Sequence, residues 1–392
     1  MVVSGSRMEQ KLEDVSGPIS VITAEQIEEQ VVSNVADLFR YEPGVTALGG
    51  AGDAQTFVIR GMGENRVKIV RDGVRQNDAY KNGGVGQSYF DTDMIKQVEV
   101  VKGPASAAYG SDALGGVIAI TTKDAADFLK GRDSYLDATT GYASSSHQKM
   151  AGVTGALRAG AFENLLRYTW RDGGVTQNYD GDKNEFDIVS QAVLFKSQWN
   201  LSDAQFLKLT VDYFNEGQDP DAVDLTKAGS VFNQPITDKE TDNLSLVLDH
   251  GIALNAPWVD RIDSKLYYAR TKQTMDQYAS SKYPVRPTNP YVTKNSLDNN
   301  GFEQKSLGAQ LKFSKALASQ RLAWGLEYEH TDNERTRFKA PTVPGDFVGY
   351  NELSFPSTTT EHGALWAFDE LKFGERWVLT PGARYDYYRM NP

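Results

Sequence analysis

Most of the chain after residue 130 alternates apolar and polar residues with a period of two. Leu207 and Leu209 would lie on one face of a strand, with Lys208 and Thr210 on the other. The same alternation recurs in two later segments, 322–329 and 377–387. A period of two predicts β-strands, and no run of 18 or more apolar residues suggests a membrane-spanning helix. Strands with one apolar and one polar face are typical of an antiparallel transmembrane barrel.

The connections between these strands alternate in length. The short ones are 159–162, 200–205, 255–260, 315–320 and 372–376. The intervening segments are long, polar and rich in Pro, Gly, Asn and Asp, and we expect them to be loops: 173–187, 215–242, 274–304 and 333–360. Short turns on one rim and long loops on the other are typical of bacterial outer-membrane barrels, whose short rim is periplasmic. About eleven strands are expected between Tyr135 and Pro392.

Composition excludes several classes of site. The chain has 392 residues and no cysteine, so it can form neither a disulfide nor a thiolate metal site. Its formal net charge of −11 disfavours nucleic acid as a partner. Phosphate-loop, dinucleotide, zinc-protease and nucleophile-elbow motifs are missing, so we expect no enzymatic activity. The segment 180–184 begins like a calcium loop but lacks the required glycine and glutamate, and a solvated loop is the better interpretation.

The first 126 residues predict a small mixed α/β domain. Strands are expected at 18–22, 56–60 and 67–70. Thr23 and Gln26 have the spacing of a capping box, so a helix should run from there to about Gln30. Ser33 is expected to cap a second helix that ends before residue 43.

A glycine-rich stretch at 95–122 predicts two strands joined in a hairpin. Valine and isoleucine dominate both ends of the stretch, and Pro104 must end the first strand because proline donates no backbone hydrogen bond. Gly110, Gly115 and Gly116 permit backbone angles or close approaches that a Cβ atom would prevent.

This stretch resembles the plug signature of TonB-dependent outer-membrane receptors. The residues that carry the resemblance are Glu99, Lys102, Gly103, Pro104, Tyr109, Gly110, Gly115 and Gly116. A second block is similar to the family's Ile-Arg-Gly strand and Asp-Gly-Val hairpin, through Arg60, Gly61, Asp72 and Gly73. The resemblance implies a mixed α/β plug domain (1–126) followed by an antiparallel transmembrane β-barrel (131–392). Family barrels have about 22 strands, so we expect a truncated sequence with about half of one.

The resemblance also implies partners and a ligand. Val2, Val3 and Ser4 fall where the family's TonB box ends, and that box pairs with TonB as an added strand. The expected location is the Gram-negative outer membrane, in contact with its lipid. Residues 115–118 and 121–129 look most like the haem and haemoglobin branch, so the expected transported ligand is haem or a haemoprotein. A ferric siderophore is the alternative, and no catalytic cofactor is implied.

Four residues are candidates for ligand contact, namely Arg75, Tyr80, Tyr89 and His147. The first three lie in the polar loop 75–92, where the family's plug apex faces the ligand. That loop lacks the apex histidine of the haem branch, which leaves the tyrosines as oxygen ligands. His147 is one of four histidines, with His250, His330 and His362, and imidazole is chemically suited to haem iron.

Three questions stay open at this stage. Arg60 and Lys102 match basic plug positions that pair with barrel glutamates in the family, but salt bridges within the plug would explain them equally well. A passive porin-like barrel with an unrelated N-terminal domain is a rival reading, which the plug blocks argue against. A soluble β-rich binding module is another, which the outward-facing Trp and Tyr residues argue against.

Overall fold

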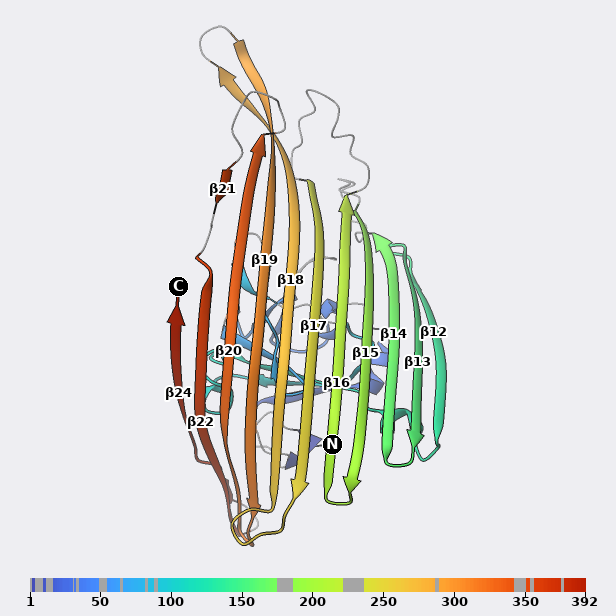
Figure 1. Ribbon diagram of the computed structural model, residues 1–392, viewed down its shortest axis with the longest axis vertical. Coiled ribbons are helices and arrows are strands. Elements are labelled where there is room, and N and C mark those ends of the chain that lie inside the picture. Colours follow the sequence, from blue (N-terminus) through green and yellow to red (C-terminus); the bar gives the residue numbers. More distant parts are fainter. Residues whose placement is uncertain are drawn as a thin grey trace.

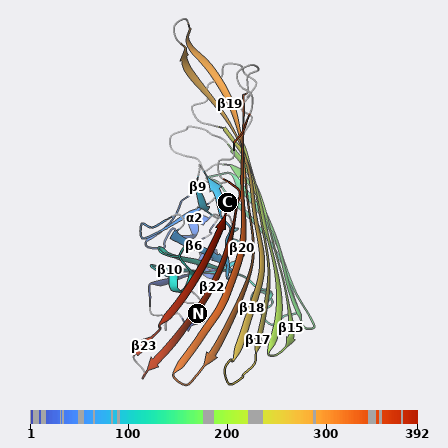
Figure 2. The ribbon, with the colours of Figure 1, turned by 60° about the vertical axis from the view of Figure 1, so that its left-hand side comes forward.

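The computed structural model describes residues 2–3, 10–11, 17–30, 32, 35–48, 55–63, 66–81, 84–87, 91–174, 186–220, 236–285, 289–341, 350–352, 356–374 and 377–392. Long strands form one curved wall, and the N-terminal part of the chain is folded against its concave side (Figures 1 and 2). Within these ranges no helix combines the length and the apolar character needed to cross a membrane.

The N-terminal part, from β3 to α4, is called the plug below. Its central sheet has the strand order β3-β10-β11-β6-β7. These strands are β3 (Ile19–Thr23), β6 (Val67–Arg71), β7 (Val74–Arg75), β10 (Ile95–Lys102) and β11 (Gly116–Thr122). All pairings are antiparallel except that of β11 with β6. The predicted strands and the 95–122 hairpin are therefore confirmed.

Four short helices cover the plug sheet or connect its strands: α1 (Ala24–Glu29), α2 (Val35–Leu38), α3 (Ser106–Tyr109) and α4 (Ala125–Leu129). The predicted capping box at α1 is present. The Gln26 amide donates to the Thr23 hydroxyl at 3.3 Å, and the Thr23 amide donates to the Gln26 side chain at 2.9 Å. The expected cap of the second helix, Ser33, lies outside the described residues.

Short strand pairs complete the N-terminal part of the chain. They are β1 (Val2–Val3) with β2 (Gln10–Lys11), β4 (Val45–Leu48) with β5 (Thr56–Ile59), and β8 (Ala79–Lys81) with β9 (Gly84–Gln87). One face of the central sheet packs on α1, α2 and the β4–β5 pair, around buried residues that include Ile27, Leu38, Phe57, Ile59 and Ile118. This cluster is the main apolar core of the plug.

The wall is a single antiparallel sheet. Its long strands are β12 (Ser134–Ala143), β13 (Gln148–Ala159), β14 (Phe162–Gly174), β15 (Phe186–Ser202), β16 (Gln205–Pro220), β17 (Ile236–Ala253), β18 (Arg261–Val285), β19 (Asn289–Ala316), β20 (Gln320–Pro341), β22 (Thr358–Phe373) and β24 (Gly382–Asn391). Two three-residue strands, β21 (Tyr350–Glu352) and β23 (Trp377–Leu379), flank them. The described residues thus contain the expected eleven long strands, with β12 and β24 at opposite edges (Figure 1).

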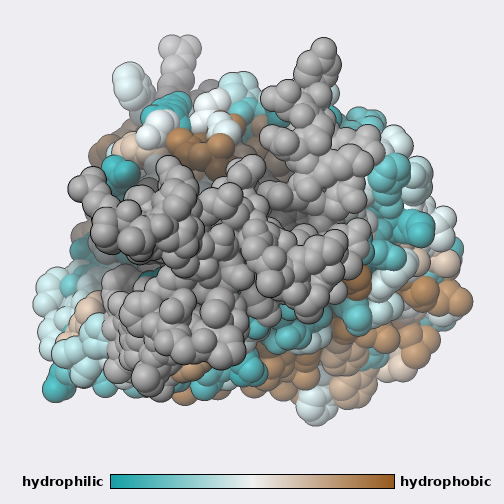
Figure 3. Space-filling model, turned by 90° about the horizontal axis from the view of Figure 1, so that it is seen from above, coloured by the Kyte–Doolittle hydropathy of each residue, from teal (hydrophilic) through white to brown (hydrophobic). Residues whose placement is uncertain are grey.

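The period-two alternation separates the two faces of the wall as predicted. Leu326 and Tyr328 are exposed on the convex face, whereas Glu327 and Glu329, which alternate with them, face inward toward Arg384 and Arg75. Seen from above, hydrophobic residues gather along one outer side of the molecule (Figure 3). The strands therefore present an apolar outer face and a polar inner face, as membrane barrels require.

Two of the predicted long loops are largely strand. The segment 274–304 continues β18 to Val285 and begins β19 at Asn289, and β20 runs to Pro341 inside the expected loop 333–360. These extensions project beyond the rest of the wall (Figure 2). Polar residues on both faces suit a two-stranded ribbon in water as well as they suit a loop, because the ladder satisfies the backbone groups. Composition alone could not distinguish the two.

Gly116 shows why the signature needs glycine. Its φ is +148°, and a Cβ atom built there would lie 2.2 Å from the Val101 carbonyl oxygen across the β10–β11 ladder. We predict that Gly116→Ala destabilises the plug by about 1–3 kcal/mol, the usual range for a backbone held in an unfavourable region. Denaturant unfolding in detergent would measure the loss. Gly17→Ala is the matched control, since nothing lies within 4 Å of its Cβ position; equal stability of both variants would contradict the argument.

Candidate functional site

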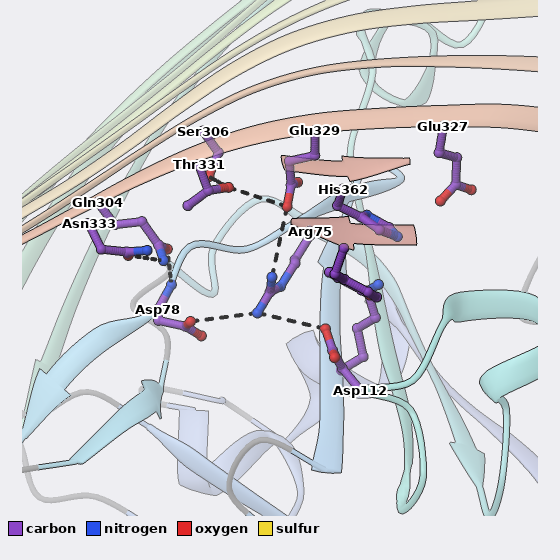
Figure 4. Close-up of polar contacts among 12 residues, drawn as sticks. Arg75, Asp78, Asp112, Gln304, Ser306, Glu327, Glu329, Thr331, Asn333 and His362 are labelled. Atoms are coloured by element: carbon purple, nitrogen blue, oxygen red, sulfur yellow. Dashed lines mark hydrogen bonds and ion pairs between the residues drawn. The ribbon is translucent and has the colours of Figure 1, made fainter. Parts of the chain in front are cut away.

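The plug meets the wall through charged and polar side chains, and Arg75 lies at one centre of this interface. Its guanidinium lies 3.5 Å from the Asp78 carboxylate, 3.8 Å from that of Asp112 and 3.8 Å from that of Glu329 (Figure 4). Desolvation disfavours the charged form, but these three carboxylates outweigh it and raise the pKa of Arg75. Arg75 therefore links two plug segments to β20.

The tight turn before β7 positions Arg75. Arg71 and Val74 pair across a two-residue connection, and Asp72 and Gly73 have φ values of +47° and +80°. Two left-handed residues in succession define the hairpin turn that Asp-Gly sequences favour. The predicted Asp72-Gly73 turn is confirmed, and it directs the start of the 75–92 segment toward β18–β20.

Glu329 is held in place by its own strand neighbours. Tyr267 Oη on β18 donates to one carboxylate oxygen at 2.7 Å, and Thr331 Oγ1 donates to the other at 3.5 Å. Ser306 Oγ on β19 lies 3.0 Å from the Thr331 hydroxyl. These bonds stabilise the ionised carboxylate that faces Arg75, so the wall side of the contact is preorganised.

A neutral contact lies beside this ion pair. The Asp78 amide donates to Gln304 Oε1 at 2.7 Å, and the Gln304 side-chain amide donates to Asn333 Oδ1 at 2.7 Å (Figure 4). Asn77 also donates to the Gln304 carbonyl at 3.1 Å. The plug segment after β7 is thus fastened to β19 and β20 by backbone and amide groups as well as by charge.

His362 lies at the same site. Its Nε2 is 2.7 Å from an Asp386 carboxylate oxygen, and its ring stacks on Tyr388 with the ring centroids 4.3 Å apart. His362, Tyr388, Tyr267 and Arg75 line a cavity of about 30 Å³. A carboxylate and an aromatic ring therefore fix the orientation of the His362 imidazole.

A second part of the interface lies on β14–β16 and contains several ion pairs. Arg167 and Arg171 on β14 pair with Asp91 and Asp93 of the plug, with Arg167 at 2.8 Å and Arg171 at 2.5 Å from Asp93. All four side chains are nearly buried. Because a buried charge without its partner is costly, these contacts hold the plug firmly.

Lys196 on β15 continues this ionic strip. Its ammonium lies 3.1 Å from the Asp124 carboxylate and 3.7 Å from that of Asp72, and it donates to the Thr122 carbonyl at 3.2 Å. Lys208 on β16 lies 3.4 Å from Asp124 as well. Desolvation by burial works against these charges, and the paired lysines nevertheless lower the pKa of Asp124.

Two family models match the chain. One, described as TonB-dependent receptor plug domain, matches residues 11–117, and the other, described as TonB dependent receptor-like beta-barrel, matches residues 169–392. The second model alone covers more than half of the 392 residues. The chain belongs to the TonB-dependent receptor family.

Relatives of this receptor include a hemin receptor of Yersinia pestis, which is 28% identical over 397 aligned residues. The match covers 99% of this chain and 54% of the relative. A probable hemoglobin and hemoglobin-haptoglobin-binding protein of Haemophilus influenzae is 25% identical, over 85% of this chain and 34% of its own length. The chain thus spans about half the length of the Yersinia relative and a smaller share of the Haemophilus relative.

Solved structures share the fold. The FrpB iron transporter of Neisseria meningitidis superposes with a TM-score of 0.71 at 19% identity, over 95% of this chain and 59% of its own. The Serratia marcescens hemophore receptor HasR, solved with its hemophore and heme, gives a TM-score of 0.70 at 21% identity, over 96% of this chain and 53% of its own. At these identities the likeness establishes the fold.

Among the described side chains of the predicted ligand residues, that of Arg75 lies at the contact between the plug and β20. Tyr80 lies in β8. Tyr89 and Ser4 lie outside the described residues. His147 occupies the β12–β13 turn at the opposite edge of the wall from β22, where it contacts the Tyr142 hydroxyl at 3.1 Å. Arg75 and His147 are therefore not parts of one site in this conformation.

The signature residue Lys102 has a partner within the plug. It forms an ion pair with Glu42 of the plug, so of the two interpretations the intra-plug salt bridge is the one that the structure contains. Arg60 is exposed at a left-handed position, and its amide donates to the Gly44 carbonyl at 2.8 Å. A fold-stabilising role of both residues in the plug explains these contacts.

Several site residues escaped sequence reasoning. Asp112 lies within the 95–122 stretch and Glu329 ends the alternating segment 322–329, but no spacing singles out either residue. Tyr267 on β18 donates to Glu329, and Tyr388 on β24 lies 3.4 Å from the Ser111 hydroxyl of the plug, so both face inward. The available signal was the strand alternation, which identifies inward positions but cannot say which of them meet the plug.

The Asp72 carboxylate generates a pH-dependent prediction. Burial opposes its ionisation, but Lys196 and hydrogen bonds from the Thr122 hydroxyl and amide lower its pKa from 3.8 to about 2. A carboxylate whose pKa is lower in the folded state stabilises the folded protein at pH values above its unfolded-state pKa. Here that stabilisation is complete above about pH 5 and is lost as the pH falls toward 2. The shift corresponds to roughly 2.5 kcal/mol.

We therefore expect Asp72→Asn to lower the free energy of unfolding by about 2 kcal/mol at pH 7. The difference from the parent protein should shrink between pH 5 and pH 2. Denaturant titrations in detergent at several pH values would measure it, and Asp203→Asn in an exposed turn is the control. A constant difference across this range would mean that the carboxylate charge is not what stabilises the turn.

Proposed function

We propose that this protein takes up haem, free or from a haemoprotein, across the Gram-negative outer membrane with energy delivered by TonB. The observation that carries the proposal is the alignment of 99% of the chain with a protein described as a hemin receptor. We assign residues 1–126 to the plug and 131–392 to the barrel. Ligand capture and passage require no covalent chemistry, so the protein acts as a transporter and not as an enzyme.

The chemistry of the plug and wall supports haem as the ligand. Haem carries two carboxylates, for which Arg75 is a suitable partner, and an iron that accepts imidazole or phenolate ligands. His362 supplies an oriented imidazole, with Tyr388 stacked on it. The cavity between them holds about 30 Å³, whereas pockets for such ligands have roughly 300–1,000 Å³. Haem would therefore bind first above this cavity, on the long-loop side.

Arg75 is occupied before the ligand arrives. Its three carboxylate partners all lie between 3.5 and 3.8 Å, which is longer than the closest ion pairs on β14. A haem propionate would compete with Glu329 for the guanidinium. Ligand capture would then weaken the contact between the plug and β20, which couples binding to a change in the plug.

TonB would act at the start of the chain. Val2 and Val3 form β1, which pairs with β2 at Gln10–Lys11 in a two-stranded sheet. A strand as short as this offers an edge to which a partner strand can be added. We propose Val2, Val3 and Ser4 as the TonB contact.

Haemin titration tests the ligand. We expect a saturable Soret shift with the protein in detergent, and a dissociation constant at least about tenfold weaker for His362→Ala, equivalent to 1.4 kcal/mol. His330→Ala is the matched control, because His330 alternates with the inward residues Glu329 and Thr331 on the same strand. Replacement of Tyr80, Tyr89 and His147 in the same assay tests the other candidate ligands.

Growth on haemin as the sole iron source tests transport. We expect growth that depends both on this protein and on TonB. Growth that survives loss of TonB would indicate a passive pore. Absence of a Soret shift together with saturable binding of a ferric siderophore would replace haem by a siderophore and leave the receptor family unchanged.

A further inference from the structure

Two cavities follow one another along the same strip of the wall. The upper one, beside Arg75, is lined by Tyr267, Glu329 and His362. The lower one holds about 120 Å³ and lies nearer the short-turn end, between Lys265 and Trp366. Along β22, residue 366 lies four residues nearer the short-turn end than residue 362. Along β18, residue 265 lies two residues nearer that end than residue 267. The cavities are therefore stacked along the direction in which a ligand must travel.

A thin partition separates the two cavities. Both are lined by Gln310 and Glu327. Gln310 Nε2 donates to the Gly73 carbonyl at 3.2 Å, and Lys265 Nζ donates to the Asp72 carbonyl at 2.8 Å. The plug contributes only backbone carbonyls of one hairpin turn to this partition. Movement of that turn would join the cavities without unpairing a plug carboxylate.

Two glycines let aromatic rings lie against the wall along this strip. A Cβ atom at Gly308 would lie 2.1 Å from the Tyr267 ring, and one at Gly325 would lie 2.6 Å from the Trp366 ring. Glycine at these two inward positions lets both aromatic rings lie against the strands. The rings consequently extend along the strands and not toward the plug.

The contacts on β14–β16 differ in kind. There the plug contributes the carboxylates of Asp91, Asp93 and Asp124, each paired with nearly buried arginine or lysine. Separating such pairs exposes charges in a poorly solvated interface, whereas the partition on β18–β20 consists of single hydrogen bonds to carbonyl groups. The partition between the two cavities is accordingly held by weaker contacts than the β14–β16 side of the plug.

We propose that the ligand crosses the barrel along the inner face of β18, β19 and β20, and that the 71–75 hairpin is the closure on this route while the contacts of Asp91, Asp93 and Asp124 with β14–β16 stay intact. This inference rests on the proposed transport function. Arg75–Glu329 closes the route above, and Gly73–Gln310 closes it below.

Cysteine tethers test the route, because the chain has no cysteine of its own. Val74→Cys with Val247→Cys fixes the hairpin to β17, since these buried valines pack in one cluster with Tyr267. Leu129→Cys with Leu165→Cys fixes the plug to β14 without removing an ionic contact, since these buried leucines pack in one cluster. Single-cysteine variants and reduction by dithiothreitol are the controls for both pairs.

Haemin binding and haemin-dependent growth are measured for each oxidised pair. We expect the hairpin tether to reduce uptake at least tenfold with binding retained and with recovery on reduction, and the β14 tether to leave uptake near the level of its single-cysteine controls. Loss of uptake with the β14 tether, or normal uptake with the hairpin tether, would overturn the route. Absence of haemin binding and growth in the parent protein would instead refute the proposed function.

A glycine variant tests the proposed route without relying on disulfide formation. Gly308→Ala must push the Tyr267 ring away from the wall and into the upper cavity. We expect uptake to fall several-fold while haemin binding is retained. Gly363→Ala on β22 is the control, because nothing lies within 4 Å of its Cβ position. Equal uptake by the two variants would exclude this strip as the path.

Discussion

A strand that faces lipid on one side must present its polar residues on the other, and this constraint organises the whole interface between plug and barrel. The inward side chains of the wall include Arg167, Lys196 and Glu329, all with little exposed surface. Charges in such positions are tolerated only when they are paired. The plug is therefore the source of counter-charges for the wall, and its position follows from where those charges lie.

The signs of the charges give the plug one orientation. β14 and β15 carry Arg and Lys toward plug aspartates, whereas β16 carries Asp212 toward Arg71 and β20 carries Glu329 toward Arg75. Rotating the plug would bring like charges together, which disfavours other arrangements more than it strengthens the native one. Apolar contacts contribute where charge is absent, as where Trp366 and Phe368 pack near Tyr109 of α3.

Local chemistry made most of the plug predictable, but the site was not. The Thr23–Gln26 capping box, the Asp72-Gly73 turn and the 95–122 hairpin depend on residues close in sequence, and all three are present. The partners of Arg75 come from a plug loop and from β20, a separation that no spacing rule covers. Polar strands projecting into water were mistaken for loops, because their residues do not have to alternate.

The Asp72-Gly73 turn connects the two halves of the interface. The Asp72 carboxylate belongs to the ionic side, where it accepts from Thr122 and faces Lys196, while its carbonyl and that of Gly73 accept from Lys265 and Gln310 on the other side. The carboxylate of Asp72 and the backbone carbonyls of Asp72 and Gly73 thus have different partners. A rotation of the peptide groups after Asp72 would release the carbonyl contacts and keep the carboxylate in place. The turn is consequently a pivot at which a firmly anchored plug can open locally.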